Sequence, residues 1–310
     1  MPSTPQTSSV PDLDAVASTR WQHLPRAKSP WLHEEIGRRM AERLDWIKRE
    51  PQRWVSWSPL LGGLAAHEAV TRRYPQAVCQ IEGPQQAAAR SLLEGVGTKP
   101  LWRRWMAAIK GASGTPVSVA GQADLLWANL SLHIHEHPQQ LLKAWLRLLQ
   151  TEGMLMFSCL GPDTLREIRH VHALQGWAPP AHPMTDMHDW GDMLIEAGFA
   201  EPVMDMERLT LTYSHAQAML NDMRDWGRNL HGGRSGHLRG RAFRAAWLDA
   251  VEASAPRTPD GQLQLTIEVI YGHAIKPVPR VKVTEATSVS MDDMRQLLKK
   301  GRPSSRHPSV

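Results

Sequence analysis

The chain has 310 residues, 42% of them hydrophobic, and a formal net charge of +5. This length can bury a large core and suggests one large domain or two small ones. No apolar run approaches the ~20 residues that span a bilayer. The first 20 residues, rich in Ser, Thr and Pro, lack the basic start and apolar stretch of a secretory signal. We therefore predict a cytoplasmic protein without a membrane partner and with a disordered tail over residues 1–20.

The cysteines and the charge exclude further classes of protein. Cys79 and Cys159 lie in separate apolar runs, which predicts buried, reduced thiols rather than a CxxC metal site. The positive charge suits an acidic partner, but it is too small and too diffuse to indicate nucleic acid by itself.

The first predicted helix spans residues 30–50. Apolar residues recur there every three or four positions, with Glu and Arg between them, and the pattern ends before Pro51. The next segment, residues 53–75, predicts a strand, a turn containing Gly62 and Gly63, and a helix. A Gly-Gly pair is by itself usually only a turn.

A second strand is predicted over residues 77–81, and Glu82 follows it at once. Residues 85–93 have a helical pattern, whereas residues 94–121 mix Gly, Lys, Arg and Trp without a clear period. The run WRRW at 102–105 could stack on bases and bind phosphates, although tryptophans on helix faces more often belong to the core. Nucleic acid is therefore a minor alternative.

The most informative stretch, residues 122–164, reads QADLLWANLSLHIHEHPQQLLKAWLRLLQTEGMLMFSCLGPDT. It predicts a buried strand at 125–128, a helix that begins at Pro138 and ends at Gly153, and a second buried strand after it. Strand, crossover helix and strand form one βαβ unit, so the two strands should be parallel neighbours.

Ligands of such sheets bind outside the carboxyl ends of the strands, which draws attention to Asn129, Leu130 and His133. His133 also begins an alternating run with His135 and His137. No carboxylate or cysteine set completes a metal site there, so we predict no metal.

The remaining segments supply further helices and strands. We predict a helix capped by Asp186 and ended by Gly198, a strand at 203–213, a helix capped by Ser214 and a strand at 263–273. Residues 281–310 are polar and predict a flexible tail.

Six arginines fall within 21 residues, and Asp225 is the single acidic residue among them: Arg224, Arg228, Arg234, Arg239, Arg241 and Arg244. This is the densest positive segment of the chain. It could steer an acidic partner, or it could be a solvated helical face; phosphate or nucleic acid would also fit.

Three stretches carry a family resemblance: DLLWANLSLH with GMLMFSCLGPDTL after the helix, DMHDWGDMLIEAGFAEPVMDMERLTLTY, and LTIEVIYGHAIKP. They resemble class I S-adenosylmethionine-dependent methyltransferases, and in particular the branch that contains the malonyl-acyl-carrier-protein O-methyltransferase of biotin synthesis. The likeness covers residues 25–280 and is strongest from Asp124 onward.

The resemblance implies an α/β, Rossmann-like fold with seven strands, mostly parallel, helices on both faces and extra C-terminal helices. One methyltransferase-like domain would span residues 21–280. Within it, a leading helix at 30–50 would cover the cofactor cleft, a cofactor-binding core would occupy 53–200, and C-terminal strands with a helical insertion would occupy 201–280. The sheet would end with an antiparallel strand inserted by a hairpin.

The resemblance also implies S-adenosyl-L-methionine as the cofactor. Its contacts would be Ser56, Gly62, Gly63, Glu82, Asn129 and Leu130. Glu82 would accept hydrogen bonds from the ribose, and the glycines would let the backbone approach the cofactor. The family pattern has an acidic residue near Ser56 and three alternating glycines, and an aromatic Tyr-Asp pair near Arg26 and Ala27. This chain departs from that pattern at all three places.

A carboxylate acceptor is already ionised at neutral pH, so methyl transfer to it needs no general base and we name no catalytic residue. A buried carboxylate needs a charged or polar partner, for which the candidates are His133, Arg228, Tyr271 and His273. The arginine-rich segment 224–244 would steer the acidic acyl carrier protein.

Three functions therefore remain open. The first is O-methylation of the free carboxyl of malonyl-acyl carrier protein. The second keeps the fold in a protein-modifying relative of the hydroxylases that act in respiratory-complex assembly. The third is a catalytically silent binding or regulatory protein, which the altered glycine loop favours and Glu82 opposes.

Overall fold

The computed structural model describes residues 13–94, 121–235 and 240–279, together with Met291 and Arg295. The chain divides into a compact unit, Met1–Pro277, and a second unit, Val278–Val310. The predicted tail at 281–310, apart from those two residues, and the WRRW run at 102–105 lie outside the described residues.

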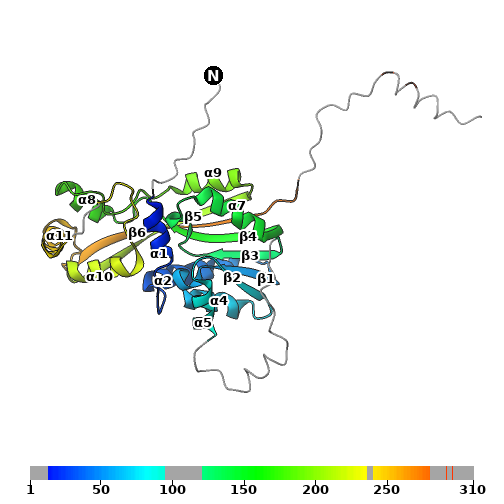
Figure 1. The fold of residues 1–310 in the computed structure, drawn as a ribbon, viewed down its shortest axis with the longest axis horizontal. Helices are drawn as coiled ribbons and strands as arrows, with labels where there is room; N and C mark the ends of the chain where they lie inside the picture. Colours follow the sequence, from blue (N-terminus) through cyan, green and yellow to red (C-terminus); the bar gives the residue numbers. More distant parts are fainter. Residues whose placement is uncertain (1–12, 95–120, 236–239, 280–290, 292–294, 296–310) are drawn as a thin grey trace, which may run out of the picture. The chain divides into compact units, whose positions relative to one another are not determined.

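A six-stranded sheet forms the centre of the first unit, in the order β2-β1-β3-β4-β6-β5 (Figure 1). The strands are β1 Arg53–Trp57, β2 Val78–Glu82, β3 Ala123–Ala128, β4 Leu149–Leu160, β5 Ala200–Tyr213 and β6 Leu263–Ile275. Strands β2, β1, β3 and β4 pair in parallel, and β6 is antiparallel to both β4 and β5. The Rossmann-like α/β fold and the inserted antiparallel strand are confirmed. Six strands, rather than the predicted seven, lie among the described residues.

Helices cover both faces of the sheet. They are α1 Ala15–Gln22, α2 Trp31–Arg43, α3 Pro59–Gly62, α4 Leu64–Arg73, α5 Gln86–Leu93, α7 Pro138–Leu148, α8 Arg166–Leu174, α9 Met187–Ala197, α10 Ala216–Trp226 and α11 Arg241–Ser254, with short 3₁₀ turns η1 Leu44–Trp46 and η2 Leu132–Ile134. None of these described helices has the length and apolar character required to cross a bilayer.

The core divides into two layers because neighbouring residues of a strand point to opposite faces. Leu125 and Trp127 of β3 pack on the side of α2, α4, α10 and α11. Leu126 and Ala128 pack on the side of α7 and α9. Burial on both faces explains why these strands appear in the sequence as continuous apolar runs.

Several predicted boundaries agree with the structure. Helix α7 begins at Pro138. Asp186 caps α9 by accepting a hydrogen bond from the His188 N–H at 2.8 Å, and Gly198 ends that helix at φ 102°. Strands β3 and β4 are parallel neighbours, as the βαβ pattern predicts.

Two predicted boundaries were wrong. Gly153 does not end α7: the helix stops at Leu148 and Gly153 lies inside β4, where a Cβ atom would approach the Ala123 carbonyl oxygen to 2.6 Å. The absence of a side chain at Gly153 therefore lets β4 approach β3 closely enough to pair with it. The cap of α10 is His215, whose Nδ1 accepts from the Ala218 N–H at 3.2 Å, and not Ser214.

The prediction of a disordered tail through residue 20 was wrong for residues 13–20. Asp14 caps α1, and Trp21 is 3% exposed at its last turn. The Ser18 hydroxyl donates to the Ile134 carbonyl at 2.5 Å, and Asp14 pairs with Arg234 at 2.6 Å. These tertiary contacts hold a segment whose polar composition gives no helical period.

We predict that Gly272→Ala destabilises the protein by ~1–3 kcal/mol, because overpacking strains a close-packed interior. The new Cβ atom would lie 2.4 Å from Phe157 Cε1 on β4. The free energy of unfolding should be measured by urea titration. Gly191→Ala, in helix α9, is the matched control: its new Cβ atom would lie 4.0 Å from Met204 Cγ, an ordinary contact distance, so the change should be neutral or stabilising by up to ~1 kcal/mol. Equal stability of the two variants would contradict this packing.

Candidate functional site

A buried amide joins the elements that meet at the carboxyl ends of β3 and β4. The Asn129 side chain donates to the His33 carbonyl at 2.7 Å and to the Gly62 carbonyl, and it accepts from the Ser158 hydroxyl at 2.5 Å. Ser158 in turn accepts from the Leu130 N–H at 3.1 Å. The structure therefore brings the predicted residues Asn129, Leu130 and Gly62 together at one crevice, which is closed here because all three residues are buried.

Helix α2 packs against this region and contacts the start of α4. Glu34 accepts hydrogen bonds from the N–H groups of Ala65 and Ala66 at the start of α4, at 3.2 and 3.1 Å. The Ser29 hydroxyl accepts from the Leu64 N–H at 2.9 Å and donates to the Leu60 carbonyl at 2.9 Å. The side chains of Ser29 and Glu34 thus satisfy the first three N–H groups of α4.

Ser56, at the position where the family pattern has an acidic residue, is fully buried at the end of β1. Its hydroxyl lies 2.8 Å from Nδ1 of His67 on α4. Burial lowers the pKa of His67 to about 4, so the imidazole is neutral at pH 7. An uncharged pair therefore replaces the carboxylate of the family pattern.

Glu82 stands at the carboxyl end of β2, where its backbone carbonyl accepts from the Ser58 N–H at 2.8 Å. Its half-buried carboxylate accepts from the Gln80 amide and retains further lone pairs for a ligand. Glu82 therefore fits the cofactor's ribose. The glycine loop does not fit the cofactor while Glu34 and Ser29 occupy it.

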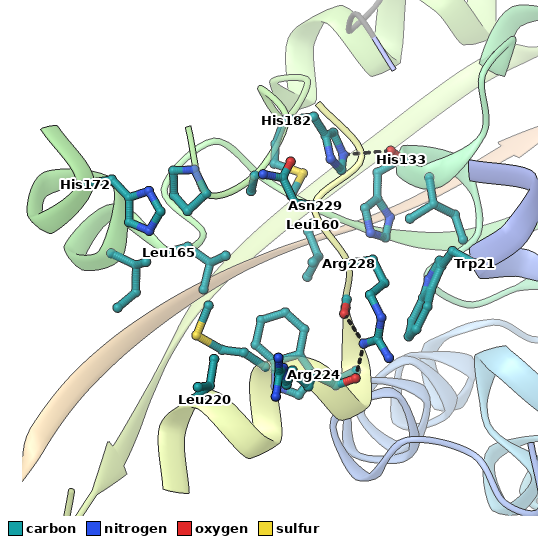
Figure 2. Close-up of a pocket in the computed structure, with 18 of the residues that line it drawn as sticks. Trp21, His133, Leu160, Leu165, His172, His182, Leu220, Arg224, Arg228 and Asn229 are labelled. Carbon is teal, nitrogen blue, oxygen red and sulfur yellow. Dashed lines mark hydrogen bonds between the residues drawn. The ribbon is translucent and has the colours of Figure 1, made fainter. Parts of the chain in front are cut away.

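A cavity of about 330 Å³ lies beside the crevice (Figure 2). Its apolar wall comes from β4, α8, α10 and α11 and includes Leu160, Leu165, Ile168, Leu220, Met223 and Trp247. His33, His133 and His182 line it, and three arginines stand around it: Arg224, Arg228 and Arg244. Two of the four predicted substrate residues, His133 and Arg228, belong to this cavity.

His133 and His182 present polar atoms inside this apolar cavity. His182 Nε2 lies 3.1 Å from the His133 carbonyl, and the two rings stack with centroids 6.5 Å apart. Nδ1 of each ring is buried without a hydrogen-bond partner among the described residues. Burial lowers the pKa of His182 to about 4 and that of His133 well below its usual range. Neutral His182 must donate from Nε2, so its Nδ1 is an acceptor that faces no donor.

Arg228 and Arg26 flank the ring of Trp21, with guanidinium carbons 4.8 and 3.9 Å from the ring centroid. Burial lowers the pKa of Arg26, and the charge of Arg228 lowers it further. Each guanidinium donates to neutral backbone carbonyls: Arg26 to Trp21 at 3.2 Å, and Arg228 to Arg224 and, at 2.7 Å, to Gly227. This end of the cavity therefore carries positive charge that an anion would neutralise.

Tyr271 and His273 point from β6 into a different cavity, of about 620 Å³, lined by α2 and β5 residues. The Tyr271 hydroxyl donates to Glu207 at 2.5 Å, and the Arg43 guanidinium carbon lies 3.6 Å from its ring centroid. The two residues share one cavity, as their alternation predicts. The structure does not bring them together with His133 and Arg228.

The arginine-rich segment 224–244 also separates in space. Arg224, Arg228 and Arg244 line the main cavity, whereas Arg234 pairs with Asp14. Arg239 lies outside the described residues. No cluster of His, Cys, Asp or Glu suited to a metal ion occurs in the described part of the chain.

Sequence reasoning missed His33 and Glu34, which contact the glycine loop from α2. His33 lies 2.7 Å from the Leu61 carbonyl and 2.9 Å from the Trp226 carbonyl. The available signal was its place beside Leu32 and Ile36 on the buried face of an amphipathic helix, where a polar side chain needs a specific partner.

The sheet order, the inserted antiparallel strand, the loop and helix after β1, and the carboxylate at the end of β2 define an S-adenosylmethionine-dependent methyltransferase of class I. No family model matches the chain. A solved putative methyltransferase from Bacillus halodurans matches with 14% identity and a TM-score of 0.47 over 77% of this chain and 99% of that one. The family assignment rests on sequence relatives instead.

The malonyl-acyl-carrier-protein O-methyltransferase of Gallionella capsiferriformans is 37% identical over 81% of this chain and 86% of that protein. The enzymes of the same name from Laribacter hongkongensis and a Methylovorus species are 36% and 35% identical, each over 83% of this chain and over 88% and 86% of their own lengths. The chain belongs to the malonyl-acyl-carrier-protein O-methyltransferase family, whose methyl donor is S-adenosyl-L-methionine.

We predict that stability falls as the pH drops from about 6.5 toward 4. The pKa values of His33, His67 and His182 are lowered to about 4 by burial, so the unfolded chain binds protons first. Each such histidine contributes a slope of ~1.4 kcal/mol per pH unit in this window. Urea unfolding at several pH values should show a smaller slope in His67→Gln. Gly272→Ala, which removes no titratable group, should keep the wild-type slope.

Proposed function

We propose that the protein transfers a methyl group to the free carboxyl of a malonyl thioester carried by an acyl carrier protein. The observation that supports this most is the apolar cavity beside the crevice, lined on one side by Arg224, Arg228 and Arg244. An apolar cavity suits the uncharged arm of a carrier, and the arginines suit the carboxylate at its end. The ester would hide that charge and prepare the chain for extension in biotin synthesis.

S-adenosylmethionine supplies the electrophilic methyl group. The residues of this chain have to bind the donor and the acceptor, orient them and exclude water. Arg228 would hold the acceptor carboxylate in its ionised form by charge pairing. His133, neutral and buried, would offer a hydrogen bond to the same end of the substrate. No side chain needs to remove a proton, because a carboxylate is already ionised at neutral pH.

The acyl carrier protein is the proposed partner, and the arginines of segment 224–244 are the proposed docking residues. Arg224 is exposed at the end of α10, and Arg244 bonds Gln217 across to α10 at 2.6 Å. An acidic carrier would be steered toward this side of the cavity by long-range attraction, which weakens as salt increases.

Arg228→Gln should lower kcat/KM for malonyl-acyl carrier protein about 10-fold to 100-fold, because a charge-assisted contact to the carboxylate is lost. The measurement is transfer of labelled methyl from S-adenosylmethionine to the carrier. Arg241→Gln is the matched control: this exposed arginine belongs to the same segment but does not line the cavity. Equal losses in the two variants would argue for general steering and against a carboxylate contact.

We also propose that Glu82 binds the ribose of the cofactor, with the turn at Gly62 and Gly63, Ser56, Asn129 and Leu130 forming the rest of the crevice. Glu82→Ala should weaken S-adenosylmethionine binding about 10-fold or more in calorimetry, because a charged acceptor is lost. Glu94→Ala, which changes an exposed carboxylate at the end of α5, is the control. Unchanged affinity in Glu82→Ala would contradict the assignment.

A further inference from the structure

Side chains of helix α2 and of the turn before it form hydrogen bonds with the N-terminus of α4, the helix that follows the glycine loop. We propose that Glu34 and Ser29 form an internal latch on the N-terminus of α4, and that S-adenosylmethionine binds when the latch is displaced. The inference rests on the methyltransferase assignment and adds residues that control cofactor binding.

The first turn of α4 is where the latch acts. A helix leaves its first N–H groups without partners inside the helix, and Rossmann-like folds offer these groups to a ligand. Here Leu64 donates to Ser29, and Ala65 and Ala66 donate to the two oxygens of Glu34. Three consecutive donors are therefore already used by the protein, two of them by a negative charge that the helix dipole favours.

The space around the loop is closed as well. A Cβ atom on Gly63 would lie 2.8 Å from a Glu34 carboxylate oxygen, and one on Gly37 would lie 2.5 Å from the Ala66 Cβ. Gly37 thus lets α2 approach α4 at a distance that no larger residue would permit. On the sheet side, a Cβ on Gly62 would lie 3.0 Å from the Asn129 carbonyl oxygen. A ligand at the loop has to move α2 rather than fill a gap.

The attachment of α2 has one weak point, at His33. Its two ring nitrogens face carbonyl oxygens, those of Leu61 and Trp226, and burial lowers its pKa to about 4. A neutral imidazole has one N–H, so one of the two contacts lacks a proton. Releasing α2 from the loop and from α10 therefore costs less free energy than breaking two full hydrogen bonds would.

The latch also links the two ligands of the reaction. Trp21, in the α1 segment that leads into α2, lines the acceptor cavity and packs with Leu61 of the glycine loop, Ile134 and Leu230. Movement of α2 away from α4 would therefore shift Trp21 and the arginines beside it. Cofactor binding should reshape the acceptor cavity before the carrier enters.

The test is calorimetric binding of S-adenosylmethionine to the full chain and to Glu34→Ala. Removing a side chain that caps the helix in the cofactor-free state should tighten binding about 10-fold. The melting temperature of the cofactor-free variant should fall, because its cap is lost. Glu35→Gln, one residue away and paired with Arg38 and Arg39 on the outer side of α2, should leave the affinity unchanged.

Hydrogen exchange gives a readout that does not depend on activity. Saturating S-adenosylmethionine should speed the exchange of α2 amides in the wild-type protein while slowing that of α4. Equal or weaker affinity of Glu34→Ala relative to Glu35→Gln would overturn the latch and leave the methyltransferase assignment intact. Absence of binding in all three proteins at millimolar cofactor would overturn the latch together with the proposed function.

Discussion

The buried amide of Asn129 is the constraint on which the site depends. A polar group removed from water has to be hydrogen-bonded, because an unpaired one costs several kcal/mol. Asn129 meets this demand with partners from three separate elements: Gly62 of the loop, His33 of α2 and Ser158 of β4. The amide therefore sets how close the loop, the leading helix and the sheet lie to one another.

The crevice and the cavity follow from that arrangement as neighbours with different character. The crevice is polar and internally satisfied: Glu34 of α2 accepts hydrogen bonds from the start of α4, and the uncharged Ser56–His67 pair joins β1 to α4. The cavity is apolar, with unpaired nitrogens on His133 and His182 and positive charge at Arg228. Methyl transfer requires the donor and the acceptor to be held in a fixed relative orientation, and two adjoining regions of different polarity suit two ligands of different charge.

Departures from the family pattern are concentrated on the side of the crevice that α2 covers. Ser56 replaces a carboxylate, and its partner His67 is kept neutral by burial, so no unpaired charge is left at the end of β1. Glu34 brings a carboxylate back, but to the start of α4 rather than to the end of β1. The carboxylates of this region therefore lie at the start of α4 and, with Glu82, at the end of β2.

The sequence by itself determined the βαβ unit around Asn129, the α9 caps at Asp186 and Gly198, and the family, because these features are local patterns of period, turn chemistry and strand ends. Tertiary structure alone decided that α1 is folded, that Gly153 belongs to a strand, and that Tyr271 and His273 lie apart from Arg228. It also decided that Glu34 reaches α4. Such contacts join residues far apart in the chain. The charge or size of a residue does not determine which distant backbone group will be its hydrogen-bond partner.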